Sequence, residues 1–173
     1  MEQNKLPEIH TERLSFRRPE QSDWKEVSYL RTDKEVNKFV KRQACETKVK
    51  AIEFITNVND KIDSGILLYW VITEKGSDQM LGSICLWKFS EDGKTAEVGY
   101  DLNPRFQGKG IMDESLKRII ELGFKNLNLN TIDAYTHEKN ESSTKLLVRN
   151  GFIFLTGQKD EDNPQNTIYK LTK

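Results

Sequence analysis

Hydrophobic residues in the first third of the chain recur at two different spacings. Residues 13–17 alternate apolar and polar side chains, which predicts a short, half-buried strand. Two later segments repeat apolar residues every three or four positions and are therefore predicted to be amphipathic helices. One begins at Ser22 or Asp23, and the other spans about 47–63. Glu26 follows three residues after Asp23, so these two residues are expected to cap the first helix.

In the middle of the chain the apolar residues take the spacing of strands. Three apolar runs follow one another closely, and the short connectors between them are rich in Gly, Ser and Asp, as is typical of turns. Because the connectors are short, each strand is expected to run antiparallel to its neighbour. The three predicted strands are residues 67–73, 80–89 and 95–102.

The last third alternates between helical and strand-like spacing. Taken with the preceding segments, the order of elements is β-α-α-β-β-β-α-β-α-β-β, which is typical of a mixed sheet covered by helices. We therefore expect an α/β (α+β) fold with about seven strands and about four helices in a single domain, residues 1–173. The elements predicted in this third are helices at 108–126 and 142–150 and strands at 131–136, 152–156 and 167–171.

Composition argues against several functional classes. Lys plus Arg and Asp plus Glu both number 27, so no net charge favours nucleic acid or an anionic membrane. No apolar run approaches the roughly 20 residues needed to cross a bilayer, and residues 1–10 lack the hydrophobic region of a secretion signal. Cys45 and Cys85 form no recognised motif, and with only His10 and His137 no metal site is expected. These features predict a soluble, cytoplasmic protein that binds neither nucleic acid nor membranes.

Residues 105–110, Arg-Phe-Gln-Gly-Lys-Gly, are the segment most informative about chemistry. Gly108 and Gly110 let the backbone approach a ligand closely and turn its amides inward. The helix predicted to follow adds unpaired N–H groups and the positive end of its dipole. Arg105 and Lys109 add cationic side chains. The segment therefore predicts a binding site for a ligand that carries phosphate groups.

Two common phosphate-binding motifs do not fit this segment. A Walker loop would carry Ser or Thr after Lys109, where Gly110 and then Ile111 stand. A dinucleotide fingerprint would carry a third glycine at the position of Asp113. Judged on the two glycines alone, an ordinary turn from strand to helix is an equally good interpretation.

The wider pattern resembles the GNAT superfamily of acyl-CoA-dependent N-acetyltransferases. Residues 105–110 resemble the family signature Arg/Gln-x-x-Gly-x-Gly/Ala. Residues 140–143, Asn-Glu-Ser-Ser, resemble the Asn-x-x-Ala/Ser start of a later helix, and residues 150–152, Asn-Gly-Phe, resemble its end. Thr-Glu-Arg-Leu at 11–14 and Glu-Val-Gly-Tyr at 97–100 also fit. The combination is most similar to the branch that contains the ribosomal-protein alanine N-acetyltransferases.

The resemblance implies a fold, a co-substrate and a set of binding residues. The fold would be a GNAT-like mixed, mostly antiparallel sheet, and the co-substrate would be acetyl-CoA, without a metal. In the family, the loop amides hold the pyrophosphate of coenzyme A. The end of the preceding strand bulges and pairs with the pantetheine arm; an ordinary sheet strand is the alternative. The residues implied to bind the cofactor are Tyr100, Asp101, Leu102, Arg105, Phe106, Gln107, Gly108, Lys109, Gly110, Ile111, Asn140 and Ser143.

The predicted catalytic residues are Glu97 and Ser143. Glu97 lies on the strand before the loop, where a carboxylate would accept a proton from the amine; an exposed strand glutamate is the alternative. Many relatives carry a tyrosine acid where this chain has Leu147, so Ser143 is the available donor to the thiolate. Tyr135 is a weaker candidate, and the thiolate can also leave without an enzymatic proton. Asn140 has a simpler interpretation as a helix N-cap.

The expected reaction is transfer of the acetyl group from acetyl-CoA to a primary amine, with a protein N-terminal amine as the first choice. Neither cysteine sits in a nucleophile motif, which favours direct attack in a ternary complex. A small amine, such as an antibiotic or polyamine, is an alternative acceptor, and a non-catalytic acyl-CoA sensor is the alternative class. The acidic run 160–162 is either a solvated loop or a border of the acceptor site. The sequence also allows a homodimer.

Overall fold

The computed structural model describes residues 6–173. Half of the segment 1–10, where no secretion signal is expected, therefore lies outside the described residues. Within residues 6–173, none of the helices combines the length and the apolar character that crossing a membrane requires.

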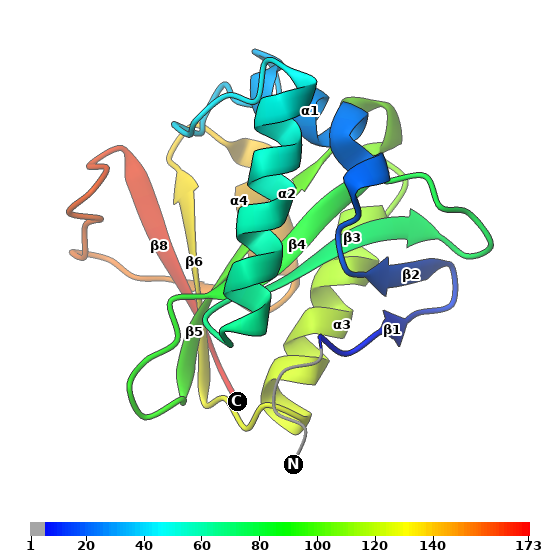
Figure 1. Cartoon of the computed structure of the whole chain (residues 1–173). Helices are drawn as coiled ribbons and strands as arrows, with labels where there is room; N and C mark the ends of the chain where they lie inside the picture. The colour runs from blue at the N-terminus through cyan, green and yellow to red at the C-terminus, as the bar shows by residue number, and fades with distance from the viewer. Residues whose placement is uncertain (1–5) are drawn as a thin grey trace.

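One mixed sheet runs through the described chain, with the strand order β1-β2-β3-β4-β5-β6-β8-β7 (Figure 1). Every neighbouring pair is antiparallel except β5 and β6, so the predicted fold class is confirmed. The sheet has eight strands instead of about seven because a two-residue strand at the edge was not predicted. The strands are β1 (Ile9–His10), β2 (Leu14–Arg17), β3 (Leu68–Glu74), β4 (Gly82–Trp87), β5 (Thr95–Leu102), β6 (Thr131–His137), β7 (Ile153–Phe154) and β8 (Asn166–Thr172).

Helices cover both faces of the sheet, as the pattern predicted. Helices α1 and α2 pack on the face that carries Val71, whereas α3 and α4 pack on the face that carries Trp70 and Ile84. Figure 1 shows α2 crossing in front of the strands, with α3 behind them. The helices are α1 (Trp24–Thr32), α2 (Lys48–Asp63), α3 (Ile111–Lys125) and α4 (Glu141–Arg149).

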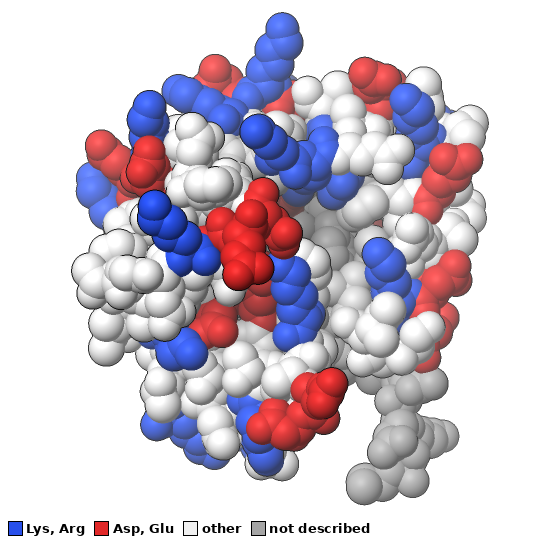
Figure 2. All heavy atoms as spheres, turned by 90° about the vertical axis from the view of Figure 1, so that its left-hand side faces the viewer, with Lys and Arg blue, Asp and Glu red and all other residues white. Residues whose placement is uncertain are grey.

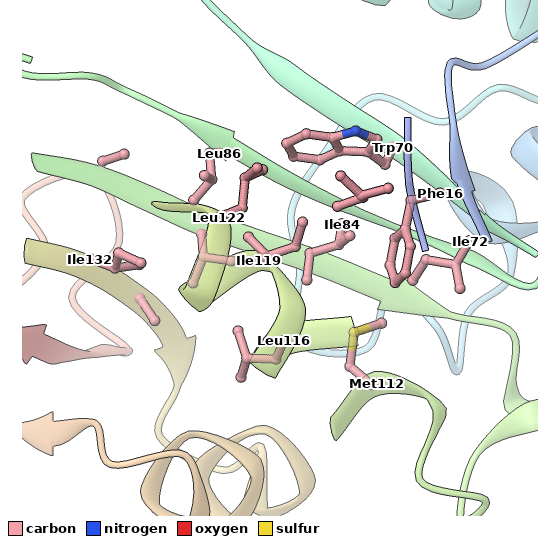
Figure 3. Packing of buried hydrophobic residues seen from close by; sticks show 14 of the residues in the cluster. Phe16, Trp70, Ile72, Ile84, Leu86, Met112, Leu116, Ile119, Leu122 and Ile132 are labelled. Atoms are coloured by element: carbon pink, nitrogen blue, oxygen red, sulfur yellow. The ribbon is translucent and has the colours of Figure 1, made fainter. Parts of the chain in front are cut away.

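The largest hydrophobic cluster fills the space between α3 and the sheet (Figure 3). Leu116 and Ile119 lie on the helix face that points toward the strands and are fully buried there. Trp70 is also fully buried, and its indole N–H donates to the carbonyl of Pro7 at 2.8 Å. This packing fixes the height of α3 above the sheet and therefore the place where the helix begins.

Several element boundaries differ from those predicted, for reasons visible in the backbone. The predicted helix 108–126 begins only at Ile111, because Gly108 and Gly110 both have φ of 75°. The predicted strand 80–89 ends at Trp87, because Lys88 has a left-handed φ of 48°. The predicted strand 152–156 shortens to Ile153–Phe154.

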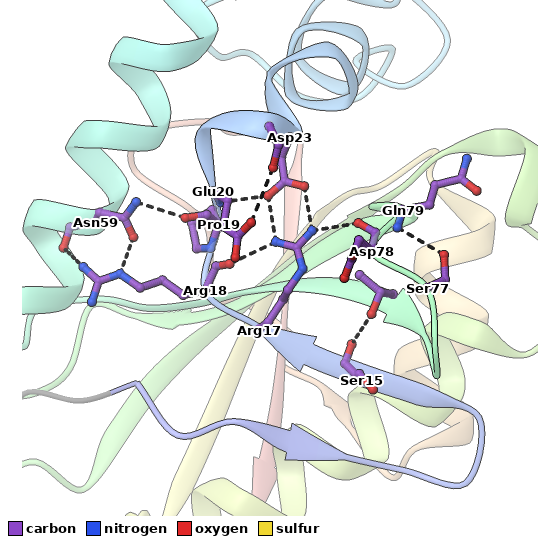
Figure 4. A network of polar contacts seen from close by, with 12 residues as sticks. Ser15, Arg17, Arg18, Pro19, Glu20, Asp23, Asn59, Ser77, Asp78 and Gln79 are labelled. Carbon is purple, nitrogen blue, oxygen red and sulfur yellow. Dashed lines mark hydrogen bonds and ion pairs between the residues drawn. The ribbon is translucent and has the colours of Figure 1, made fainter.

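The expected Asp23–Glu26 cap is wrong, because the Asp23 carboxylate is engaged elsewhere. Its two oxygens accept hydrogen bonds from the two terminal nitrogens of Arg17 at 2.8 and 2.7 Å. It also accepts the N–H of Glu20 at 2.8 Å (Figure 4). Glu26 instead accepts the side-chain amide of Asn103 at 2.6 Å. These bonds join α1 to the ends of β2 and β5.

We expect Asp23→Ala to lower the free energy of unfolding by about 3–5 kcal/mol, because it leaves a largely buried guanidinium without its partner. The side chains of Asp23 and Arg17 are only 4% and 18% exposed. Asp63→Ala is the matched control, since it removes the exposed Arg18–Asp63 pair and is expected to cost less than about 1 kcal/mol. Urea denaturation measures both values, and equal losses would contradict the assigned role of Asp23.

Candidate active site

The two parallel strands of the sheet separate partway along their length. The register of β5 with β6 runs from Thr95 opposite Thr131 to Val98 opposite Ala134 and ends there. Both strands continue, β5 to Leu102 and β6 to His137. The backbone edge of residues 99–102 therefore faces a gap instead of a neighbouring strand. We refer to this gap as the β5–β6 opening.

No bulge accompanies the opening, which corrects the expectation of a bulge at the end of β5. The register of β5 with β4 is continuous from Glu97, opposite Trp87, to Leu102, opposite Gly82. The pairing of β5 is therefore interrupted only on the edge that faces β6. An extended chain such as a pantetheine arm would find unused backbone hydrogen-bonding groups along this edge.

The loop at 105–110 closes one end of the opening and has the geometry of an anion site. Within residues 6–173, the backbone N–H groups of residues 108–113 donate to no acceptor. The side chains of Arg105 and Lys109 are exposed beside them. Free amides at a helix start, with two cations nearby, suit the pyrophosphate of coenzyme A. An added Cβ at Gly108 would meet nothing within 4 Å, so the space above that residue is open.

The N-terminal hairpin braces this loop from outside. Arg13 donates from Nη1 to the carbonyl of Lys109 at 3.0 Å and from Nε to Glu114 at 2.6 Å. Thr11 donates its hydroxyl to the same carboxylate at 2.5 Å. Burial alone would raise the pKa of Glu114, but the hydrogen bonds from Thr11 and Arg13 lower it. The Thr-Glu-Arg-Leu pattern was the only sequence signal for this brace, and it did not reveal the partners.

Glu97 lies on the face of β5 that α1 and α2 cover. Its side chain is only 12% exposed, and its Oε2 lies 3.2 Å from Nζ of Lys88. Burial raises the pKa of the Glu97 carboxyl, the charge of Lys88 opposes the rise, and Asp160 and Asp133 add to it. A raised pKa makes this carboxylate a stronger proton acceptor near neutral pH.

Other acidic groups surround Glu97. Asp133 is its direct neighbour in the β5–β6 register, and Asp160 lies close enough to raise the pKa of both Glu97 and Lys88. Asp160, from the predicted acidic run, is held in place by the side-chain amide of Asn166 at 2.8 Å. Figure 2 shows Asp and Glu side chains gathered near the middle of this side of the molecule, beside a hollow and among Lys and Arg.

Ser143 lies on the opposite face of the sheet, in the first turn of α4. It is 9% exposed, and its Oγ is 2.7 Å from the hydroxyl of Tyr100. Burial raises the pKa of Tyr100 to about 12, so this phenol keeps its proton near neutral pH. Sequence reasoning placed the backbone of Tyr100 at the cofactor but missed its hydroxyl. Strand alternation put Tyr100 and Glu97 on opposite faces, but only the tertiary structure shows α4 on the Tyr100 side.

Three further positions considered in the sequence analysis do not offer a better proton donor. Leu147 is fully buried in the core, which explains why an apolar residue occupies the position of the usual tyrosine. Tyr135 alternates onto the Glu97 side of β6, away from Ser143, and its ring lies 5.5 Å from Nζ of Lys88. Asn140 caps α4 by accepting the N–H of Ser143 at 3.2 Å.

The connector between α1 and α2, residues 33–47, covers the end of the opening. Arg42 of this connector pairs with Asp101 at 2.9 Å and donates to the carbonyl of Leu30 at 2.7 Å. The ring of Phe39 packs on the ring of His137 at the end of β6, with 5.1 Å between their centroids. The carboxylate of Asp101 is thus used to hold the connector, which leaves its backbone for a ligand.

The remaining predicted binding residues have structural contacts. Gln107 donates its amide to the carbonyl of Leu102 at 3.3 Å, and Phe106 packs against the hydrophobic core. Ile111 is buried at the start of α3. Within the described chain, no group of three or more His, Cys, Asp or Glu side chains is arranged to hold a metal ion. Burial raises the pKa of the Cys85 thiol to about 12, which makes it a poor nucleophile.

The site therefore combines four features around one opening. An amide-rich loop at one end suits phosphate groups, and an unpaired strand edge suits an extended arm. A carboxylate lies on one face, and a hydroxyl pair lies on the other. Together they match the needs of acyl transfer from a phosphate-bearing thioester to an amine.

Comparisons with known proteins agree with this geometry. A model of the family described as "Acetyltransferase (GNAT) domain" matches residues 13–153. The uncharacterized N-acetyltransferase p20 of Bacillus licheniformis is 32% identical over 139 residues, which cover 80% of this chain and 78% of that protein. The ribosomal-protein-serine acetyltransferase of Escherichia coli is 32% identical over 76 residues, which cover 44% of this chain and 42% of that protein.

A solved structure shows the same fold. The ribosomal-protein-S5-alanine acetyltransferase of Vibrio fischeri aligns with a TM-score of 0.80 and 21% identity over 96% of each chain. The family model matches most of the chain, including the loop at 105–110 and both catalytic candidates. The chain therefore belongs to the GNAT family of acetyltransferases and is an acetyl-CoA-dependent N-acetyltransferase.

Proposed function

We propose that this enzyme acetylates the α-amine at a protein N-terminus, by direct attack of the amine on acetyl-CoA in a ternary complex. The observation that carries the proposal is the placement of Glu97 and Ser143 on opposite faces of the β5–β6 opening. A thioester in the opening would have a proton acceptor on one side and a hydroxyl donor on the other.

The proposed step needs no covalent intermediate on the enzyme. The amine nitrogen forms a bond to the thioester carbonyl carbon while its proton passes to Glu97. The carbon–sulfur bond then breaks, and the thiolate leaves with a hydrogen bond from the hydroxyl of Ser143, while the proton taken from the amine stays on Glu97 until it exchanges with solvent. Tyr100 acts as a positioning residue, because its hydroxyl lies 2.7 Å from Oγ of Ser143, where either oxygen can donate, and this contact holds the serine hydroxyl in place. The raised pKa of the Cys85 thiol supports direct attack over a cysteine relay.

The acceptor side of the opening supports a cationic substrate. Glu97, Asp133 and Asp160 all lie near one another there, and their charge favours an ammonium group. The names of the Escherichia coli relative and the Vibrio fischeri structure, a ribosomal-protein-serine and a ribosomal-protein-S5-alanine acetyltransferase, favour a ribosomal-protein N-terminus as the acceptor.

A thiol-release assay with acetyl-CoA tests the acceptor class directly. The panel holds peptides that begin with Ser, Ala or Met, the same peptides already acetylated at the N-terminus, and small amines such as spermidine and an aminoglycoside. Release with free N-termini alone supports the proposal. Release with small amines alone makes this a small-molecule acetyltransferase, and release with neither would overturn the proposed acceptor class.

Two further properties remain predictions. Sedimentation of the purified protein checks for a homodimer, and fractionation of cells that express it checks for a cytoplasmic location.

We expect Gly108→Ala to weaken acetyl-CoA binding at least about tenfold, because the left-handed backbone that presents the loop amides becomes strained. Gly65→Ala is the matched control, since Gly65 has φ of 71°, equally open space and a position in the turn after α2. Calorimetry gives the affinities and thermal unfolding gives the stabilities. If both variants lose the same stability and Gly108→Ala keeps the wild-type affinity for acetyl-CoA, the loop is not part of the binding site.

We expect Glu97→Gln to lower kcat/KM by about 10²–10⁴-fold. Because burial raises the Glu97 pKa, the wild-type rate should fall as pH drops through that pKa and level off above it. The variant should lack this plateau and keep rising with pH toward the amine pKa of about 8. Rates measured from about pH 5.5 to 9 check this, with Asp133→Asn as the neighbouring-carboxylate control. If Glu97→Gln has the wild-type pH–rate profile, Glu97 is not the base and its role is structural.

We expect Ser143→Ala to lower kcat while the KM for acetyl-CoA stays nearly unchanged, because the bond to the thiolate forms mainly in the transition state. Tyr100→Phe should act in the same direction, and the double variant should be no slower than Ser143→Ala, since Tyr100 acts through Ser143. Tyr135→Phe is the control on the opposite face. A slow Tyr135→Phe with a normal Ser143→Ala would identify Tyr135 as the acid, and normal rates throughout would mean that the thiolate leaves unassisted.

A further inference from the structure

Lys88 is held in an unusual position directly after β4. Its backbone φ of 48° lies in the left-handed region, which residues other than glycine and asparagine rarely adopt. This conformation ends the strand and directs the side chain back over the sheet, toward β5 and β6. The Nζ of Lys88 lies 3.2 Å from Oε2 of Glu97, the proposed base.

Two aromatic rings complete the surroundings of this ammonium group. Nζ lies 4.4 Å from the ring centroid of Trp87 and 5.5 Å from that of Tyr135, both within the range of cation–π attraction. The Lys88 side chain is nevertheless 52% exposed, whereas that of Glu97 is 12% exposed. A cation is therefore held against a buried carboxylate by a side chain that solvent can still reach.

We propose that the ammonium group of Lys88 occupies the position that the ammonium group of the acceptor takes, and that Lys88 determines specificity as an internal competitor. This inference rests on the proposed function, because it concerns the amine side of the same opening. An acceptor must displace Lys88 before it reaches Glu97. Only substrates that make enough further contacts displace the lysine efficiently. A peptide makes such contacts through the residues that follow its N-terminal amine.

The charged groups that face this position are mostly acidic, and Lys88 is the cation paired with Glu97. Glu97 lies on β5, Asp133 and Tyr135 on β6, and Asp160 on the connector before β8. Lys170 of β8 lies 3.6 Å from Asp133, farther than a hydrogen bond, and Oδ1 of Asp133 is buried without a hydrogen-bond partner among residues 6–173. With Lys88 in place, the three carboxylates and two lysines carry a net charge of −1; displacement of Lys88 makes it −2, and an incoming primary ammonium returns it to −1.

The chemistry of the contacts also defines the ligand. A primary ammonium carries the same charge and the same three N–H donors as the lysine that it replaces. A neutral molecule would leave the Glu97 carboxylate buried without its counter-ion, which is unfavourable. The displaced lysine is free to move into solvent, and the acceptor amine then lies beside the base that takes its proton.

The experiment measures binding of propylammonium in the absence of acetyl-CoA, through the indole N–H signal of Trp87 in an NMR titration at about pH 8, where this amine is protonated. Trp87→Phe assigns the signal. We expect Lys88→Met to bind propylammonium at least about tenfold more tightly than the wild type. Lys88→Arg keeps the cation and should match the wild type. Lys170→Met removes the lysine that lies beside Asp133 on this face and should change the affinity much less.

Equal affinities in Lys88→Met and Lys170→Met would overturn the inference, because a general charge effect would then explain both. Absence of propylammonium binding in every variant would overturn it as well. The titration involves no acetyl transfer, so its result stands apart from the outcome of the acceptor panel. With any peptide that the panel identifies, Lys88→Met should lower the KM for small amines more than the KM for that peptide.

Discussion

The end of the pairing between β5 and β6 is the constraint on which the site depends. These strands form the only parallel pair in the described sheet, and their carboxyl ends lead into α3 and α4. Both helix N-termini are therefore delivered to the same edge of the sheet. Had the register continued past Val98, ladder hydrogen bonds would have used the strand edge and drawn the two helix starts together. The early separation keeps that edge free and leaves room between the helices.

The alternation of β5 then gives the opening two chemically different sides. Glu97 and Asp101 alternate onto the side of α1 and α2, where both carboxylates are paired with basic residues. Tyr100 alternates onto the side of α3 and α4, where its ring packs against the apolar core and its hydroxyl reaches α4. One strand thus carries a polar side for a charged partner and an apolar side that keeps a hydroxyl pair out of water.

The sequence predicted the parts of this fold that depend on local patterns. Hydrophobic spacing located the four helices and the long strands, and the loop at 105–110 followed from paired glycines before a helix. Features that depend on distant partners were missed, because periodicity carries no information about them. The Asp23 carboxylate, for example, bonds to Arg17 instead of capping α1, and the contact between Tyr100 and Ser143 spans 43 residues of sequence. The strand β1, with two residues, is too short to show a period.

The brace formed by Arg13 has a consequence for how the binding loop acquires its shape. Arg13 and Glu114 are 101 residues apart in sequence, and two strands, β3 and β4, lie between β2 and β5 in the sheet. The contact therefore closes a ring that runs from the edge of the sheet, across the helical layer, to the loop at 105–110. The loop is braced only when that ring is complete, and contacts so far apart in sequence form slowly because the loop-closure entropy must be overcome first. Loosening of the N-terminal hairpin, far from any reacting atom, would therefore change the affinity for acetyl-CoA before it changed the chemical step.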